Sequence, residues 1–202
     1  MFEQPNTESI AILIDCWTDV NSDLIQNIKN YCVDNTSIKA IFLNSYARLS
    51  DNLSKDEPYW SNSNSIFNLE TKFDELRNQW KNALFEHITT THKDLLKPWT
   101  RPDQNLFSAF SSLQILYYCN YINPAVDKIY FFGEAWDICV KYRPTGWMQI
   151  NALNYHNLFH TKKMLLSRPE CVANSSHQIL TEFEHGWQRL PNGDYQLTED
   201  IW

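Results

Sequence analysis

Three side chains at the ends of apolar runs could together carry out nucleophilic chemistry. Asp15 ends the run IAILID, Lys97 follows the short run DLL, and Cys139 lies six residues after Gly133, which closes the run KIYFF. A carboxylate can take the proton of a thiol, and an ammonium group stabilises the thiolate and the negative charge that develops during attack on a carbonyl. This set of groups suits the formation and hydrolysis of a thioester.

The segment around Cys139 is the most informative part of the chain. An apolar run closed by a glycine is typical of a buried strand that leaves a sheet, and Cys139 would then lie in the first turn of the next helix. A helix N-terminus lowers the pKa of a thiol and offers N–H groups to an oxyanion. The alternative is an inert structural cysteine, because free cysteines are among the most buried residues.

Apolar runs alternate with helical patterns, which predicts β-α-β units. The expected fold is α/β, a three-layer α/β/α sandwich around a mainly parallel sheet of five to six strands. The predicted strands are 10–15, 39–43, 94–96, 128–132 and 161–167, and the predicted helices are 20–33, 69–87, 106–122, 137–153 and 175–187.

Non-regular segments complete this plan. Residues 44–68 are polar and predict a long loop, and Pro144 and Gly146 are expected to kink or interrupt the helix 137–153. The expected domain spans residues 1–187 and is followed by a hairpin or tail in 188–202, where Asn192-Gly193 indicates a tight turn. Parallel strands end at one edge of a sheet, so the three candidate catalytic groups are expected to meet there.

Composition limits the classes of partner. The 202-residue chain is long enough for one full core, and its net charge of −7 argues against nucleic acid or an anionic membrane as partner. No apolar run approaches the roughly 20 residues that span a bilayer, and the first residues lack the features of a signal peptide. A cytoplasmic protein acting on a small molecule is the simplest expectation.

Cysteine and glycine usage excludes further classes. The five cysteines are scattered and form no C-x-x-C pair, which is typical of reduced thiols. Only four glycines are present, and neither of the common glycine-rich phosphate-binding patterns occurs. Nucleotide binding by those routes is therefore not expected, and we expect no cofactor.

Several segments together resemble the isochorismatase-like cysteine hydrolases, a family that includes nicotinamidases and carbamoylases. The resemblance covers about residues 8–187. It is carried by ILID with Asp15, LLKP with Lys97, FSAF at 107–110, GEAWDICV at 133–140 and MLLSRPECVANSS at 164–176.

The resemblance implies roles for these residues. Cys139 would be the nucleophile, Asp15 the general base and later the acid, and Lys97 the electrostatic partner. Backbone N–H groups of Cys139 and of the residues before it would form the oxyanion hole, and the segment Glu134, Ala135 and Trp136 would contribute to the pocket. The family often has a cis peptide in this segment, and its members commonly form homodimers or homotetramers.

Two departures from the family pattern bear on the site. Trp136 stands where the family has a small residue, so that its indole would either shrink the pocket or form a stacking wall. The loop after the second strand contains no histidine, which disfavours the metal site of nicotinamidases. His156 and His160 could share a helix face, but no third ligand follows at helical spacing, so no metal is expected.

Other side chains have two interpretations. Four aromatic residues in or beside predicted strand-end loops could line a pocket for a flat substrate, or could belong to the core; they are Trp17, Tyr46, Trp99 and Phe107. Lys97 could be a solvated lysine, in which case Arg101 in the adjoining loop could supply the positive charge instead.

The sequence supports two candidate functions. The first is a metal-independent hydrolase of a small amide or related C–N bond that acts through a thioester on Cys139. The alternative is an inactive member of the fold that serves as a small-molecule-binding or protein-interaction module, which the bulky Trp136 and the scarcity of glycine favour.

Overall fold

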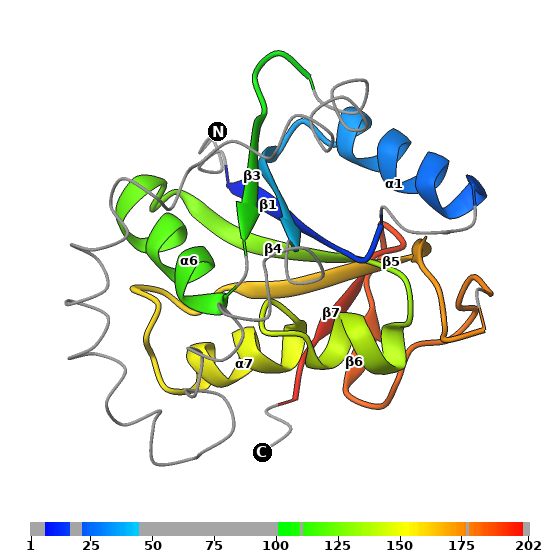
Figure 1. Ribbon diagram of the computed structural model, residues 1–202. Helices are drawn as coiled ribbons and strands as arrows, with labels where there is room; N and C mark the ends of the chain where they lie inside the picture. Colours follow the sequence, from blue (N-terminus) through cyan, green and yellow to red (C-terminus); the bar gives the residue numbers. More distant parts are fainter. Residues whose placement is uncertain (1–6, 17–21, 45–100, 110, 177, 200–202) are drawn as a thin grey trace, which may run out of the picture.

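A computed structural model describes residues 7–16, 22–44, 101–109, 111–176 and 178–199 (Figure 1). Several expectations lie outside these residues: the loop from 45 to 68, the helix 69–87, the strand 94–96, and the candidate site residues Lys97, Trp17, Tyr46 and Trp99.

The described residues form one seven-stranded sheet in the order β3-β2-β1-β4-β5-β7-β6. The first five strands in this order are mutually parallel, whereas β7 is antiparallel to both β5 and β6. The predicted mainly parallel α/β sheet is thus confirmed, but it has seven strands among the described residues rather than five to six, because the C-terminal hairpin adds β6 and β7 to it. The strands are β1 (Glu8–Ile14), β2 (Ile38–Asn44), β3 (Asn105–Ala109), β4 (Val126–Gly133), β5 (Met164–Val172), β6 (Trp187–Arg189) and β7 (Tyr195–Leu197).

Helices cover both faces of the sheet (Figure 1). Successive side chains of β1 point to opposite faces of the sheet. Ile10 and Ile12 pack with residues of α6 and α7, whereas Ala11 and Leu13 pack with α1. Strands buried on both faces read as continuous apolar runs, which is why IAILID was recognisable. The helices are α1 (Ser22–Asp34), α6 (Ser112–Tyr117), the π-helical turns η2 (Tyr118–Ile122) and η3 (Trp136–Val140), and α7 (Trp147–Tyr155).

Two predicted helices are wrong in part or whole. Residues 105–109, expected to end a loop and begin the helix 106–122, form β3 beside β2. No helix exists among the described residues of 175–187, because the Asn174 side chain accepts hydrogen bonds from the backbone N–H groups of Ser176 and Gln178 and so favours a turn. The expected interruption of the helix 137–153 is confirmed, since η3 and α7 are separate helices on either side of Pro144 and Gly146.

Strands β6 and β7 form an antiparallel hairpin that is part of the main sheet. Gly193 occupies its turn with φ +91°, and β7 pairs with β5. The carboxylate of Asp194, which is completely buried, accepts hydrogen bonds from Tyr31 of α1 (2.8 Å), Tyr130 of β4 (3.2 Å) and Arg168 of β5 (3.1 Å). These bonds join the hairpin to the rest of the fold.

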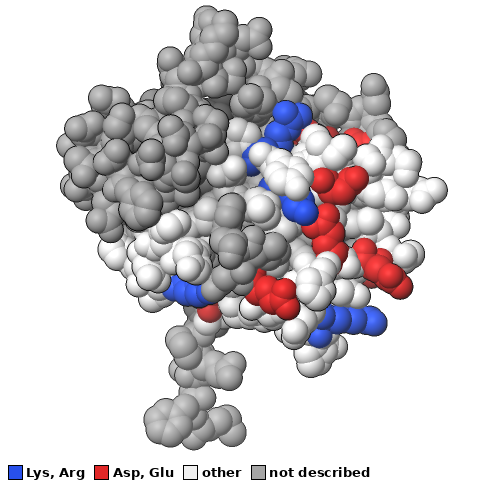
Figure 2. Space-filling model, turned by 90° about the horizontal axis from the view of Figure 1, so that it is seen from below, with Lys and Arg blue, Asp and Glu red and all other residues white. Residues whose placement is uncertain are grey.

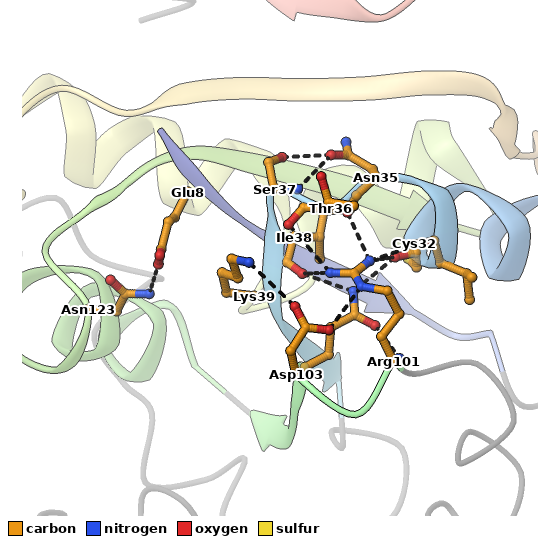
Figure 3. A network of polar contacts seen from close by, with 12 residues as sticks. Glu8, Cys32, Asn35, Thr36, Ser37, Ile38, Lys39, Arg101, Asp103 and Asn123 are labelled. Atoms are coloured by element: carbon orange, nitrogen blue, oxygen red, sulfur yellow. Dashed lines mark hydrogen bonds and ion pairs between the residues drawn. The ribbon is translucent and has the colours of Figure 1, made fainter. Parts of the chain in front are cut away.

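Arg101 stabilises the turn between α1 and β2 (Figure 3). Its guanidinium donates hydrogen bonds to five backbone carbonyl groups at 2.8–3.5 Å, those of Cys32, Val33, Asn35, Thr36 and Ile38. The last carbonyl groups of a helix have no partner within the helix, and Arg101 supplies one for α1.

The surface carries mixed charge. Figure 2 shows acidic side chains gathered toward the right of the face that it presents, with Lys and Arg side chains among them. Of the helices that the structure describes, none combines the length and the apolar character needed to cross a bilayer.

Candidate active site at the carboxyl edge of strands β1 and β4

Asp15 and the segment before Cys139 lie at adjacent strand ends. Asp15 directly follows β1, and β4 pairs with β1 in parallel up to the pair Ile14 and Gly133. Asp15 and Ala135 both have φ of 55°, a left-handed conformation that is unfavourable for residues other than glycine. Strained backbone of this kind is concentrated at functional sites, because only a strongly determined surrounding structure maintains it.

The turn after β4 is held between its two neighbouring strands. The Glu134 N–H donates to the carbonyl of Ile14 (3.3 Å), and the Trp136 N–H donates to the carbonyl of Ala173 (2.7 Å), just beyond β5. A side chain at Gly133 would place its Cβ 2.0 Å from the Ile14 oxygen, so only glycine fits. These contacts determine where η3 begins.

The cis peptide expected in the segment 134–136 is not found: the described residues contain no cis peptide bond. The chain reverses instead through two unusual conformations on either side of Glu134, Gly133 with φ +140° and Ala135 with φ +55°.

Asp15 forms an ion pair with Arg143, a residue that the sequence analysis missed. The Arg143 guanidinium donates from Nη2 (3.1 Å) and Nε (3.3 Å) to the same oxygen, Asp15 Oδ2. The Asp15 side chain is only 15% exposed, so the pair is partly shielded from water. The Arg143 backbone N–H donates to the Cys139 carbonyl (3.0 Å), and the four-residue spacing was the available signal that both residues share one helix face.

Asp15 also interacts with the thiol of Cys139. Burial, the hydrogen bond to Asp15 and the negative charge of Asp15 together raise the pKa of this thiol to about 11, and Arg143 opposes the shift. Cys139, Asp15 and Arg143 therefore form one connected group, and the thiol is protonated at neutral pH.

The direction of this shift corrects the expectation of a helix terminus that lowers the thiol pKa. η3 has five residues, and the N–H groups of Ile138 (3.0 Å) and Val140 (3.2 Å) both donate to the carbonyl of Ala135. A turn of this length aligns few peptide dipoles, so burial and the charge of Asp15 outweigh its effect on the thiol pKa.

Backbone donors for an oxyanion are fewer than expected. The N–H groups of Glu134 and Trp136 are bound to Ile14 and Ala173, and that of Ile138 is bound to Ala135. An oxyanion at this site would therefore depend on the backbone N–H groups of Asp137 and Cys139.

A second thiol near Asp15 is chemically different. Cys16 follows Asp15 but is buried on the opposite face of the sheet, among the residues that pack against α1, and its S–H group donates to the Ile14 carbonyl (3.5 Å). Burial raises the pKa of Cys16 well above its ordinary value. Of these two thiols, only that of Cys139 is partly exposed.

Two of the aromatic pocket candidates belong to the core. The Trp136 indole is 1% exposed and contacts the rings of Trp147, Phe183 and Trp187 at centroid distances of 4.7–5.9 Å. Phe107 on β3 packs against Phe42 and Tyr118. Trp136 therefore faces the interior, and its bulk neither narrows the surface beside Cys139 nor provides a stacking wall there.

The other charged and metal-binding candidates lie away from Cys139 or lack the geometry of a metal site. Arg101 binds the turn after α1 and contributes no charge to Cys139. α7 ends at Tyr155, so His156 and His160 do not share a helix face. Among the described residues, no group of three or more His, Cys, Asp or Glu side chains is arranged to hold a metal ion.

Comparisons of this chain with protein-family models, with curated proteins and with solved structures found no match.

Proposed function

We propose that this protein is a cysteine hydrolase of a small amide or related C–N bond, of the isochorismatase-like kind, with Cys139 as nucleophile. One observation carries the proposal: the partly exposed Cys139 thiol interacts with a carboxylate, Asp15, that a fixed guanidinium, Arg143, orients. A nucleophile, its base and a third group that holds the base are the minimum for activated covalent catalysis.

The acylation step follows from the protonated thiol. The Asp15 carboxylate takes the thiol proton while the Cys139 sulfur forms a bond to the carbonyl carbon, and the carbonyl π electrons move to oxygen. When this tetrahedral intermediate collapses, the C–N bond breaks and Asp15 gives its proton to the departing amine. The product of this half-reaction is a thioester on Cys139.

Hydrolysis of the thioester uses the same groups in reverse order. Asp15 takes a proton from a water molecule, whose oxygen attacks the thioester carbon. Collapse breaks the C–S bond, Asp15 returns the proton to the sulfur, and the carboxylic acid leaves. No metal or cofactor is needed for this sequence.

The rest of the proposal concerns the fold and the assembly. A parallel sheet with helices on both faces supports a three-layer isochorismatase-like domain, in which strand ends display the reactive groups. Arg143 supplies positive charge beside Asp15, and Lys97 would be a second cation in the same role. A homodimer or homotetramer in the cytoplasm is part of this proposal.

The test offers the protein a panel of small amides and measures turnover as the amine released. Intact-protein mass spectrometry then looks for a thioester on Cys139. Wild type is expected to release an amine from at least one amide, and Cys139→Ala is expected to release none while keeping the wild-type circular dichroism spectrum. Cys32→Ala, which removes a thiol buried in α1, is the matched control and should retain activity. Undiminished turnover by Cys139→Ala would falsify the mechanism.

One observation favours the alternative, a non-catalytic module that binds a small molecule or a protein. A thiol with a pKa of about 11 is a poor nucleophile unless a base assists it. If wild type consumes no amide and forms no thioester, but binds members of the panel unchanged, the alternative function is the correct one.

A further inference from the structure

A cavity lies at the opposite edge of the sheet from Cys139. Cys139 follows the end of β4, whereas this cavity of about 360 Å³ lies at the start of the parallel strand β5. α7 and the end of β7 form its other sides. The residues that matter for its chemistry are Asn151, Asn154, Lys163, Met164, Leu165 and Leu197.

Two buried polar side chains in its wall have their hydrogen bonds within the protein. The Asn154 amide donates to the Lys163 carbonyl (3.0 Å) and accepts from the Lys163 N–H (3.4 Å). The Lys163 ammonium group donates to the carbonyl of Val126 and to the hydroxyl of Thr161 (3.4 Å). These two side chains bind neighbouring backbone and need no ligand.

Asn151 is different. It lies one turn before Asn154 on α7 and is 3% exposed, yet its Nδ2 group has no hydrogen-bond partner among the described residues. Buried polar groups are almost always paired, because an unpaired one loses its hydration without compensation. A buried amide that lines a cavity with an unused donor is a binding feature.

We propose that this cavity binds a small, neutral, planar molecule through a cis-amide edge, as found in lactams and in the uracil type of nucleobase. In such an edge an N–H and a C=O group lie side by side. The N–H would donate to Asn151 Oδ1, and the C=O would accept from Asn151 Nδ2, giving two parallel hydrogen bonds.

The rest of the cavity suits the same chemistry. Met164, Leu165 and Leu197 offer apolar contacts to the faces of a flat ring. The charged side chains of the lining are of both signs: Lys162 and Lys163 are positive and Glu199 is negative. The Lys163 ammonium group already donates to Val126 and Thr161, so it is not set up to bind an anion. The volume is within the range of small-molecule sites.

The experiment uses the full chain and three probes. 2-Pyridone presents the cis-amide edge, N-methyl-2-pyridone lacks its donor, and uracil presents the same edge on a nucleobase. Binding is followed by NMR through the Asn151 side-chain amide signals, and by the thermal unfolding midpoint. We expect 2-pyridone to shift those signals and to bind about tenfold or more tightly than its N-methyl analogue. If uracil binds more tightly than 2-pyridone, the ligand is of the nucleobase type. If uracil binds more weakly than 2-pyridone, the ligand is a simple lactam.

Two variants separate a binding role from a structural one. Asn151→Leu removes the unpaired amide at similar volume, so it should abolish 2-pyridone binding while unfolding at the wild-type temperature or higher. Asn27→Leu removes a half-buried amide of α1 that lines a different cavity, so it is the matched control and should bind 2-pyridone as wild type does.

Three results would overturn the proposal. They are equal affinity for 2-pyridone and its N-methyl analogue, a clear loss of stability in Asn151→Leu without probe, and a crystal structure in which another part of the chain fills the cavity. None of these results bears on Cys139, so this inference and the proposed hydrolase succeed or fail separately.

Discussion

Arg143 donates two hydrogen bonds to a single oxygen of Asp15, Oδ2, and none to the other carboxylate oxygen. An arginine that only neutralised a carboxylate would pair more strongly through both oxygens. The observed contact holds the carboxylate in one orientation and keeps one oxygen clear of the guanidinium. In the proposed mechanism, this second oxygen would exchange a proton with Cys139.

Replacing Arg143 should impair the chemistry without removing the nucleophile. Arg143 lowers the pKa of the Cys139 thiol and orients Asp15, so Arg143→Ala should raise that pKa further and reduce kcat/KM by about 100-fold. Arg143→Lys should recover part of the loss, because it restores the charge but not the two-bond contact. Steady-state kinetics on any accepted amide measures this, and Arg189→Ala on the exposed side of β6 is the control. A wild-type kcat/KM in Arg143→Ala would show that Arg143 plays no part in the reaction.

Alkylation of Cys139 by iodoacetamide should be slow at neutral pH. Only the thiolate reacts, and a pKa of about 11 leaves it scarce until the solution becomes strongly alkaline. The rate should rise about tenfold per pH unit between pH 7 and pH 10, as the thiolate fraction does.

Asp15→Asn should accelerate this alkylation while abolishing turnover. The negative charge of Asp15 raises the thiol pKa, so its removal lowers that pKa and increases the thiolate fraction at a given pH. Peptide mapping after timed labelling measures the rate at Cys139 alone. Slower labelling in the variant would show that Asp15 does not face the thiol as described.

Gly133→Ala should destabilise the site and the fold together. The added Cβ would lie 2.0 Å from the Ile14 carbonyl oxygen, and the backbone cannot relax without separating β1 from β4. We expect a loss of about 3 kcal/mol or more in the free energy of unfolding, measured by denaturant titration. Gly193→Ala is the matched control: its φ is also positive, but the nearest atom is the flexible end of Arg168 at 3.0 Å, so a loss of about 1 kcal/mol is expected. Equal losses in the two variants would contradict this explanation.

Arg101→Ala should affect stability and leave the site intact. Five carbonyl groups from the end of α1 to the start of β2 would each lose a hydrogen bond. Those of Cys32 and Ile38 keep a bond from the Gln104 side chain, and that of Asn35 keeps one from the Ile38 N–H, so we expect a loss of about 2 kcal/mol in the free energy of unfolding. The alkylation rate of Cys139 should not change. A changed rate would support the interpretation in which Arg101 supplies charge to Cys139.

Much of the sheet could be predicted because parallel strands buried on both faces are short apolar runs between turn residues. β1, β2, β4 and β5 were all recognised in this way, and Gly146 indicated correctly where one helix ends and the next begins. β3 was missed, since NLFSA has no long apolar run and precedes a helical pattern without a break. The helix 175–187 was wrong, because local side-chain bonds from Asn174 compete with helix formation and leave no mark in the spacing of apolar residues.

The sequence by itself determined that Asp15 and the turn before Cys139 each follow an apolar strand, because strand ends are local features of the chain. Only the tertiary structure decided what surrounds them. Burial and the charge of Asp15 raise the thiol pKa, the Trp136 indole points into the core, and Arg143 rather than Arg101 lies beside Asp15. Each of these depends on contacts between residues distant in sequence, and the physical quantities involved, burial and the distance between charges, do not exist until the chain has folded.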